Sequence, residues 1–358
     1  MRCRELLALV ATLLAVVLFA SGCGTKVAYF STHVQVVVSK GIAFPDASHA
    51  WLMGNAYGRD GWAYEGSAIL ATSDGGTSWK RQVWAAGNWQ PCSVVFSNDR
   101  CGWMLGGATP NAPDPNYVLA TTDGGATWQK KDTGTSGLDD QLYDIACVGT
   151  RRAWAVGGGT GGLLLATTDG GATWRRETFR RALGAVAFAD ARHGWVVGDG
   201  GILGTTDGGR TWRREPSATP YNPGTIVCVN AKDAWALGQA RQDPKTERNV
   251  VLATTDGGAT WKVRYATRAG VWLAMAFADA AHGWIVGYGG LILATTDGGY
   301  TWHRQVSGTN LMLTDVAFAD AAHGLVVGER TKGDDPEGAE FIGTILLRTS
   351  DGGATWTR

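Results

Sequence analysis

The phrase TTDGGATW, at residues 121–128, decides the fold because it returns six more times along the chain in nearly the same letters. The other copies are TSDGGTSW (72–79), TTDGGATW (167–174), TTDGGRTW (205–212), TTDGGATW (254–261), TTDGGYTW (295–302) and TSDGGATW (349–356). A repeat period of roughly 40 to 50 residues is typical of solenoids, propellers and other arrays. The number of copies therefore predicts the number of structural units.

Each copy predicts a tight turn between two strands. The paired glycines allow backbone angles that a side chain would forbid, and the Asp carboxylate can accept hydrogen bonds from the amides of its own turn. Because an active site needs one constellation and not seven equivalent ones, we interpret these aspartates as structural. They are Asp74, Asp123, Asp169, Asp207, Asp256, Asp297 and Asp351.

The repeat extends upstream of the Asp turn. Residues 185–195 read AVAFADARHGW and residues 275–284 read MAFADAAHGW, each followed by a Gly-rich stretch and then the turn. The unit is thus a short apolar strand, a polar turn, a second strand opening on Trp, a variable loop, a third strand, the Asp turn and a fourth strand. Four antiparallel strands make one propeller blade. The sequence predicts an all-β fold, a seven-bladed β-propeller of four-stranded antiparallel blades over residues 34–358.

Two repeated residue types belong to this architecture. Thirteen of the 17 Trp occupy the Asp turns or the start of the second strand, which leaves Trp62, Trp84, Trp89 and Trp272 for other roles. Four histidines share one register, and we expect each to bond the Asp three residues before it, because separate blades hold them too far apart for a common metal site. The pairs are Asp46 with His49, Asp190 with His193, Asp279 with His282, and Asp320 with His323. No metal or cofactor is predicted.

The amino terminus predicts the compartment. A basic start is followed by the apolar run 6–19, which has the length of a signal-peptide core and is short for a spanning helix. The ending Ala-Ser-Gly-Cys at residues 20–23 resembles a bacterial lipobox. We expect residues 1–22 to be a lipoprotein signal peptide, Cys23 the lipidated residue and residues 23–33 a tether. The protein would then be extracytoplasmic, at the cell surface, in the periplasm or in a lumen, on a lipid anchor; a plain secretory signal or a retained anchor is the alternative.

The charge balance bears on the class of partner, and the positions of the cysteines bear on their burial and pairing. The 32 basic residues balance the 32 acidic ones, which disfavours a nucleic-acid partner.

Cys147 and Cys228 align with Phe188, so we expect both to be buried. Cys92 and Cys101 flank the first hairpin of one blade, and an oxidising compartment would favour a disulfide between them. Residues 34–38 (VQVVV) are expected to pair with the last blade and close the ring.

The propeller geometry also predicts a working face. Turns between strands one and two and between strands three and four share one rim, whereas the variable loops and the blade-to-blade linkers share the other. Arg and aromatic residues, which protein-binding hot spots favour, gather in the linkers. The resulting candidates for partner binding are Arg175, Arg176, Arg180, Arg181, Arg213, Arg214, Tyr221, Arg264, Arg268, Trp84, Trp89 and Trp272.

The phrase (S/T)xDGGx(S/T)W resembles the Asp box of BNR repeats. Together with AFADAxHGW, it makes the chain similar to the photosystem II assembly and stability factor family, a family of seven-bladed lumenal propellers. The resemblance implies a monomeric, non-enzymatic scaffold that binds a membrane-protein assembly intermediate or another extracytoplasmic protein. It also implies an Arg patch at the partner site, for which Arg175, Arg176, Arg180, Arg181, Arg213 and Arg214 are the candidates.

A glycoside hydrolase is the alternative, because sialidases and some polysaccharide hydrolases also carry Asp boxes on propellers. A sialidase needs three clustered Arg, a Tyr nucleophile with a Glu partner, and an Asp acid. Glu is scarce in the variable loops, and the opening FRIP motif of sialidases is absent from the sequence. The sequence therefore favours the binding scaffold.

Overall fold

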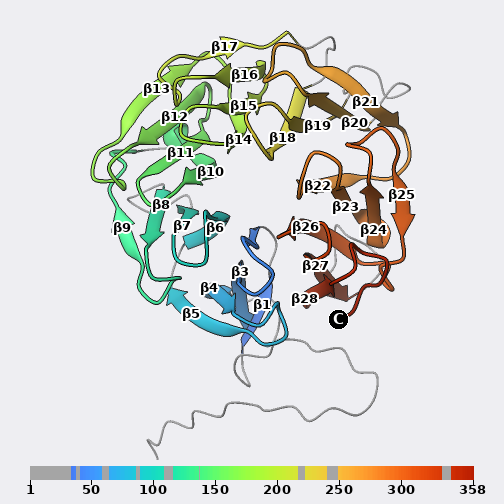
Figure 1. Ribbon diagram of the computed structural model, residues 1–358. Helices are drawn as coiled ribbons and strands as arrows, with labels where there is room; N and C mark the ends of the chain where they lie inside the picture. Colours follow the sequence, from blue (N-terminus) through green and yellow to red (C-terminus); the bar gives the residue numbers. More distant parts are fainter. Residues whose placement is uncertain are drawn as a thin grey trace, which may run out of the picture.

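The computed structural model describes residues 34–37, 41–58, 64–85, 89–108, 116–136, 138–216, 222–239, 249–332 and 340–358. Seven antiparallel sheets stand as blades around one axis, each with its first strand nearest that axis (Figure 1). This is the seven-bladed β-propeller that the sequence predicts. In the described part of the chain, no helix is long and apolar enough to span a membrane.

The first four blades follow one another in chain order. Blade 1 holds β2 (Ile42–Ala43), β3 (Ala50–Gly58), β4 (Tyr64–Thr72) and β5 (Lys80–Ala85), with β1 (Val34–Val37) beside β3. Blade 2 holds β6 (Trp89–Phe96), β7 (Gly102–Ala108), β8 (Asn116–Thr121) and β9 (Gln129–Lys131). The 3-10 turn η1 (Leu138–Asp140) precedes blade 3, which holds β10 (Leu142–Val148), β11 (Arg152–Gly157), β12 (Gly162–Thr167) and β13 (Arg175–Phe179). Blade 4 holds β14 (Leu183–Phe188), β15 (Gly194–Gly198), β16 (Gly201–Thr205) and β17 (Arg213–Arg214).

The remaining three blades complete the ring. Blade 5 holds β18 (Asn222–Cys228), β19 (Ala234–Gln239), β20 (Asn249–Thr254) and β21 (Lys262–Thr267). Blade 6 holds β22 (Trp272–Phe277), β23 (Gly283–Gly287), the 3-10 turn η2 (Tyr288–Gly290), β24 (Leu291–Thr295) and β25 (His303–Gln305). Blade 7 holds β26 (Met312–Phe318), β27 (Gly324–Lys332) and β28 (Glu340–Thr349), and Thr357 forms a single bridge to Arg348 in place of a longer fourth strand.

A β-bulge recurs in the innermost strands. In blade 3, Leu142 pairs with Gly157 and Asp144 with Val156, so that Tyr143 is the extra residue. The partner must be Gly, because a Cβ on Gly157 would lie 2.1 Å from the carbonyl oxygen of Gln141. Equivalent shifts occur in blades 2, 4, 5, 6 and 7. The bulge bends each inner strand at the end opposite the Asp turns.

Neighbouring blades are joined by aromatic side chains. Trp154 of blade 3 stacks on Phe188 of blade 4 with the ring centroids 3.5 Å apart, and its Nε1–H donates to the carbonyl of Gly208 at 3.0 Å. Phe188 meets the Asp-turn Trp212 edge-on at 6.0 Å. The same stack links blades 1 and 2, 5 and 6, and 6 and 7. The core is therefore a set of apolar layers between blades, and we call each layer a joint, numbered by its two blades.

Joints 2/3 and 4/5 are built differently. Cys147 and Cys228 stand where the other blades carry Phe. Cys147 is buried in joint 2/3, as expected, whereas Cys228 is only partly buried against the core of joint 4/5. In joint 2/3, Trp103 instead meets Trp174 directly and edge-on, at 5.8 Å. Joints 1/2 to 6/7 are thus of two kinds.

Two aspartates on inner strands also cross joints. Oδ1 of Asp144 accepts from Ser93 Oγ of blade 2 at 2.8 Å, and Oδ2 accepts from the Val186 amide of blade 4 at 3.0 Å. Asp315 occupies the equivalent position in blade 7, and its Oδ2 accepts from the Gly41 and Ile42 amides of blade 1, each at 3.1 Å. Asp315 therefore connects the last blade to the first.

Two sequence expectations are wrong. Residues 34–37 pair with β3 inside blade 1 rather than with blade 7, because the short β2 leaves the far half of β3 open for them. Cys92 and Cys101 form no disulfide. Cys92 lies between Pro91 and Ser93, which pair with Gly106 and Leu105, whereas Cys101 precedes Gly102 at the other end of β7. A disulfide needs Cα atoms about 4.4–6.8 Å apart, and the length of the hairpin separates them further.

Candidate protein-binding surface

The rim that carries the Asp turns, here called the turn face, is occupied by internal hydrogen bonds. Asp123 accepts from Thr121 Oγ1 at 2.8 Å, from the Thr127 amide at 2.9 Å and from Thr127 Oγ1 at 2.6 Å. Hydrogen bonds from the Thr127 side chain and amide lower the pKa of Asp123 to about 2. The other six Asp-turn carboxylates have the same kind of partners and lowered pKa values. These carboxylates hold their own turns as ionised acceptors, as the sequence predicts.

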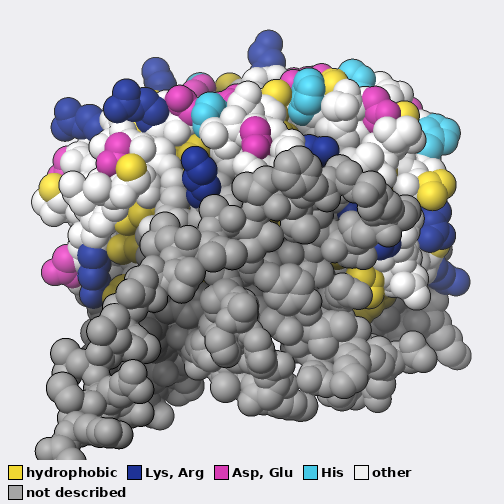
Figure 2. All heavy atoms as spheres, turned by 90° about the horizontal axis from the view of Figure 1, so that it is seen from below, with side chains coloured by type: hydrophobic (Ala, Val, Ile, Leu, Met, Phe, Trp, Pro, Cys, Tyr) yellow, Lys and Arg dark blue, Asp and Glu magenta, His cyan; other side chains and the backbone are white. Residues whose placement is uncertain are grey.

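The four repeated histidines lie on the same face. His193 Nδ1 is 2.8 Å from Asp190 Oδ2, and the other three make the same contact with their own Asp at 2.9–3.1 Å. The expected Asp–His pairs are therefore confirmed. Figure 2 shows this rim at the top, where histidines stand among acidic and basic side chains.

Two of the candidate arginines are engaged in holding the fold. Arg176 forms an ion pair with Asp140, which is buried before blade 3, and this hydrogen-bonded partner lowers the pKa of Asp140. Arg175 reaches the carbonyl of Gly209 in the blade 4 Asp turn and contacts Glu177 Oε2 at 3.0 Å. Both arginines belong to the outermost strand β13, so the linker expected from the sequence is largely a strand.

Other arginines lie on the outer wall of the ring. Arg213 and Arg214 form β17, and both are exposed. Arg264 lies in β21, with its guanidinium 4.0 Å from the ring centroid of Tyr300 in the next Asp turn. These three residues therefore lie along the side of the propeller and not on the rim where the sequence analysis places them.

The rim opposite the Asp turns, here called the loop face, keeps three of the candidates. Arg180 and Arg181 follow β13, Arg268 follows β21, and all three are exposed. Arg181 Nη1 donates to the carbonyl of Asp199 at 3.3 Å, and no hydrogen bond or ion pair within the described residues holds the Arg180 or Arg268 side chain. These cations are available to a partner from blade 3 to blade 6.

Exposed apolar residues that the sequence analysis missed share this face. Tyr143 is 40% exposed, Val271 47% and Tyr288 43%. Tyr143 is the bulge residue of β10, and its hydroxyl donates to the Gly158 carbonyl at 3.1 Å, which leaves its ring at the surface. In the sequence, a large aromatic where blades 4 and 5 carry Gly184 and Gly224 is the signal that could have identified it. Cations beside exposed aromatic and aliphatic groups are typical of protein-binding surfaces.

The aromatic candidates have different outcomes. Trp272 is 3% exposed and stacks on Tyr265 of blade 5 at 6.1 Å, so it belongs to joint 5/6 and not to a surface. Trp84 and Trp89 lie in β5 and β6, and their side chains lie outside the part of the structure that is described. Tyr221 and Cys23 lie outside the described residues, so their roles stay predictions.

Comparison with known proteins gives one family. The family model described as photosynthesis system II assembly factor YCF48 matches residues 178–269, 246–304 and 264–358. No curated protein matches the chain.

Two solved structures share the fold. A structure titled YCF48 bound to D1 peptide has a TM-score of 0.60 at 18% identity, covering 91% of this chain and 99% of its own. YCF48 from Cyanidioschyzon merolae has a TM-score of 0.60 at 20% identity, covering 92% and 99%. A GH74 xyloglucanase from Xanthomonas campestris has a TM-score of only 0.39 at 13% identity, covering 88% and 61%.

Proposed function

Because this chain belongs to the photosynthesis system II assembly factor YCF48 family, we propose that it is a non-enzymatic scaffold that binds a segment of a membrane protein during assembly. The observation that carries the proposal is the mixed composition of the loop face, on which Arg180, Arg181 and Arg268 and several Tyr and Val side chains are exposed. A related propeller is described as bound to a D1 peptide, which supports a peptide segment as the ligand.

The chemistry of the loop face fits such a ligand. Guanidinium groups recognise carboxylates through paired donors, and exposed aromatic rings bury apolar side chains at low entropic cost. The ligand we infer is therefore a segment with at least one acidic group beside apolar residues. The Asp-turn carboxylates, whose pKa values are lowered, would make poor general acids, so these seven residues offer no support for hydrolysis.

We also propose the extracytoplasmic location. Residues 1–22 as a lipoprotein signal and Cys23 as the acylated residue would place the ring beside the membrane in which its partner is assembled. Metabolic labelling with a fatty-acid analogue tests this directly. Incorporation into the wild type and its loss in Cys23→Ser are expected, whereas equal labelling of both proteins would contradict the anchor.

Affinity capture from the native membrane tests the binding surface. The wild type is compared with Arg180→Glu/Arg181→Glu/Arg268→Glu, and co-purified membrane proteins are quantified by mass spectrometry. Reversing three charges at the interface should lower recovery of a specific partner at least about tenfold, since each buried charge contact contributes on the order of 1 kcal/mol or more.

The outer wall provides a matched control for this experiment. Arg213→Glu/Arg214→Glu reverses exposed charges in the same ring, away from the loop face. Recovery of the partner should be unchanged in this variant. Equal recovery in all three proteins, or a loss confined to the wall variant, would overturn the loop-face assignment.

A further inference from the structure

The outer wall of the ring, which links the turn face to the loop face, is strongly basic. In all seven blades the first two residues after the Asp-turn Trp include at least one Lys or Arg, and each of these basic side chains is exposed. The chain as a whole is neutral, so this positive charge is local. Charged residues on outermost strands prevent pairing with another sheet, but that role requires no particular sign of charge.

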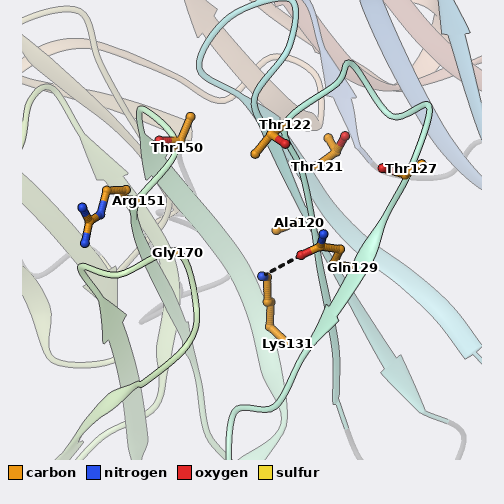
Figure 3. A pocket seen from close by; sticks show the side chains of 9 residues that line it. All are labelled: Ala120, Thr121, Thr122, Thr127, Gln129, Lys131, Thr150, Arg151 and Gly170. Carbon is orange, nitrogen blue, oxygen red and sulfur yellow. Dashed lines mark hydrogen bonds between the residues drawn. The ribbon is translucent and has the colours of Figure 1, made fainter.

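On blades 2, 3 and 4, acidic side chains accompany the cations of the wall. Glu177 lies in β13 and forms an ion pair within that strand, Glu215 follows β17, and the exposed Asp132 follows β9. Figure 3 shows that Lys131 of β9 also turns to its own strand, where its ammonium group donates to Gln129 Oε1 at 3.3 Å beside a hollow lined mostly by polar residues. The charge of these walls is therefore partly balanced.

The walls of the neighbouring blades 5 and 6 lack this balance. Their outermost strands, β21 and β25, lie next to each other on one side of the ring (Figure 1), and the chain contains no Asp or Glu from 262 to 278 or from 298 to 314. Lys262 and Arg304 are exposed, and among the described residues no ion pair engages Lys262, Arg264 or Arg304. This part of the wall keeps its positive charge.

The carboxylates that precede these two segments belong to the Asp turns. Asp256 accepts from Thr260 Oγ1 at 2.7 Å, and Asp297 accepts from Thr301 Oγ1 at 2.6 Å. Both are thus held by their own turns on the turn face, and within the described chain neither forms an ion pair with a cation of the wall.

The same two blades also expose apolar side chains. Val263 is 41% exposed, Tyr300 59% and Val306 86%. Arg264 connects the two blades, because its guanidinium lies 4.0 Å from the ring centroid of Tyr300. Tyr300 stands at the turn-face edge of the wall, and Val306 follows β25 at the loop-face end, so that the apolar groups are spread over the height of the wall. The other large hydrophobic side chains that are exposed in the described residues lie on the loop face.

We propose that this lateral patch contacts the surface of an anionic lipid bilayer; its residues are Lys262, Val263, Arg264, Tyr300, Arg304 and Val306. Lys and Arg attract anionic headgroups, and Tyr and aliphatic side chains enter the interfacial region of a bilayer. An acidic protein fits less well, because the apolar side chains are dispersed, whereas protein hot spots cluster at a packed centre. The patch lies on the side of the ring, which leaves the loop face free.

Hydrogen–deuterium exchange of the full-length protein tests the patch. The protein is incubated with vesicles of phosphatidylcholine alone or with about 30% phosphatidylglycerol, and amide exchange is followed by mass spectrometry. Peptides that cover residues 262–267 and 303–306 should exchange at least about threefold more slowly with the anionic vesicles than with the neutral ones. The protection should disappear in about 1 M salt, where the Debye length is about 3 Å.

The walls of the ring supply matched variants. Lys262→Glu/Arg304→Glu reverses two charges of the lateral patch, and the protection should fall to the level seen with neutral vesicles. Arg213→Glu/Arg214→Glu reverses the same number of charges on the wall of blade 4 and should keep the wild-type protection. Val306→Ser changes no charge and should roughly halve the protection, because it removes one apolar contact with the bilayer.

Three results would overturn the proposal. Equal exchange of the wild type with both kinds of vesicle would exclude the lipid contact, and protection by soluble polyglutamate but not by vesicles would assign the patch to an acidic protein. Equal losses in the blade 4 variant and the patch variant would show a diffuse attraction of the whole wall. The inference does not rest on the proposed function, since partner capture in detergent reports on the loop face without a bilayer.

Discussion

Joints 3/4 and 2/3 solve the same packing problem with different residues. In joint 3/4, the ring of Phe188 fills the space between Trp154 and Trp212, whereas joint 2/3 has Cys147 at that place and brings Trp103 and Trp174 into direct contact. The difference extends to the residue that precedes Trp in the second strand. A Cβ on Gly194 would lie 2.5 Å from the Phe188 ring, while blade 3, which has Cys147, carries Ala153 instead.

The pairing recurs around the ring. Phe goes with Gly in blades 2, 4, 6 and 7, and Cys goes with Ala in blades 3 and 5, while blade 1 combines Phe44 with Ala50. A methyl group in the strand thus replaces part of the volume of the missing ring. Close packing makes the two positions one unit, so that changing either alone should cost stability.

The largest loss of stability is expected when a methyl group is added to a joint that contains Phe. Gly194→Ala should lower the free energy of unfolding by about 2–3 kcal/mol, because the new Cβ collides with the Phe188 ring. Urea denaturation followed by Trp fluorescence measures it. The control, Ala153→Gly in blade 3, should cost only about 1 kcal/mol, mainly through backbone entropy. Equal losses in the two variants would mean that the joints do not differ in this respect.

Placing Phe in a joint that has Cys tests whether the Phe–Gly and Cys–Ala combinations act as units. Cys147→Phe should destabilise the protein by about 2 kcal/mol, since the Ala153 methyl group occupies space that the ring needs. Adding Ala153→Gly should restore most of that loss, which a double-mutant cycle would register as a coupling of about 1–2 kcal/mol. Strictly additive losses would contradict the two-residue unit.

The carboxyl group of Asp144, which accepts hydrogen bonds from two neighbouring blades, should make the free energy of unfolding depend on pH. Burial raises the pKa of Asp144 to about 6, although hydrogen bonds from Val186 and Ser93 oppose the shift. Between about pH 4 and 6 the folded state then holds a proton that the unfolded state has lost, so the free energy of unfolding should fall by at most about 3 kcal/mol as pH rises through this window. Denaturation midpoints across the window, compared with Asp144→Asn, isolate the effect. Parallel pH profiles in the two proteins would exclude it.

The smallest difference in stability is expected from the loss of one hydrogen bond. Trp154→Phe removes the donor to the Gly208 carbonyl, whereas Trp103→Phe removes an indole that donates no hydrogen bond to any of the described residues. Both lose ring area, and Trp154→Phe should cost about 1 kcal/mol more. Thermal unfolding measures the difference. A larger loss in Trp103→Phe would show that stacking in joint 2/3 outweighs the hydrogen bond in joint 3/4.

The repeat was sufficient to predict the blades, the Asp turns and the Asp–His pairs, because these depend on residues close in sequence. The repeat could not predict the contacts between blades. The partner of Arg176, Asp140, lies 36 residues away, and Trp272 is buried because it packs against side chains of blade 5. The structure therefore gives a different candidate surface from the one predicted. The outer-wall arginines do not lie on the loop face, whereas Tyr143 and Tyr288 do. No local pattern distinguishes an arginine bound within the fold from one facing solvent.

Asp315 and the seam between blades 7 and 1 have a mechanical consequence. Each blade is held by two neighbours, so the breaking of a single joint turns the ring into an open row without releasing any blade. Leu325 replaces Trp at the seam, where the Asp315 carboxylate, a hydrogen bond from Arg348 to Thr77 Oγ1 and the apolar contacts around Phe44 hold the two blades together. If this seam opened, every blade would keep one neighbour, and escape of a blade would require a second, independent rupture.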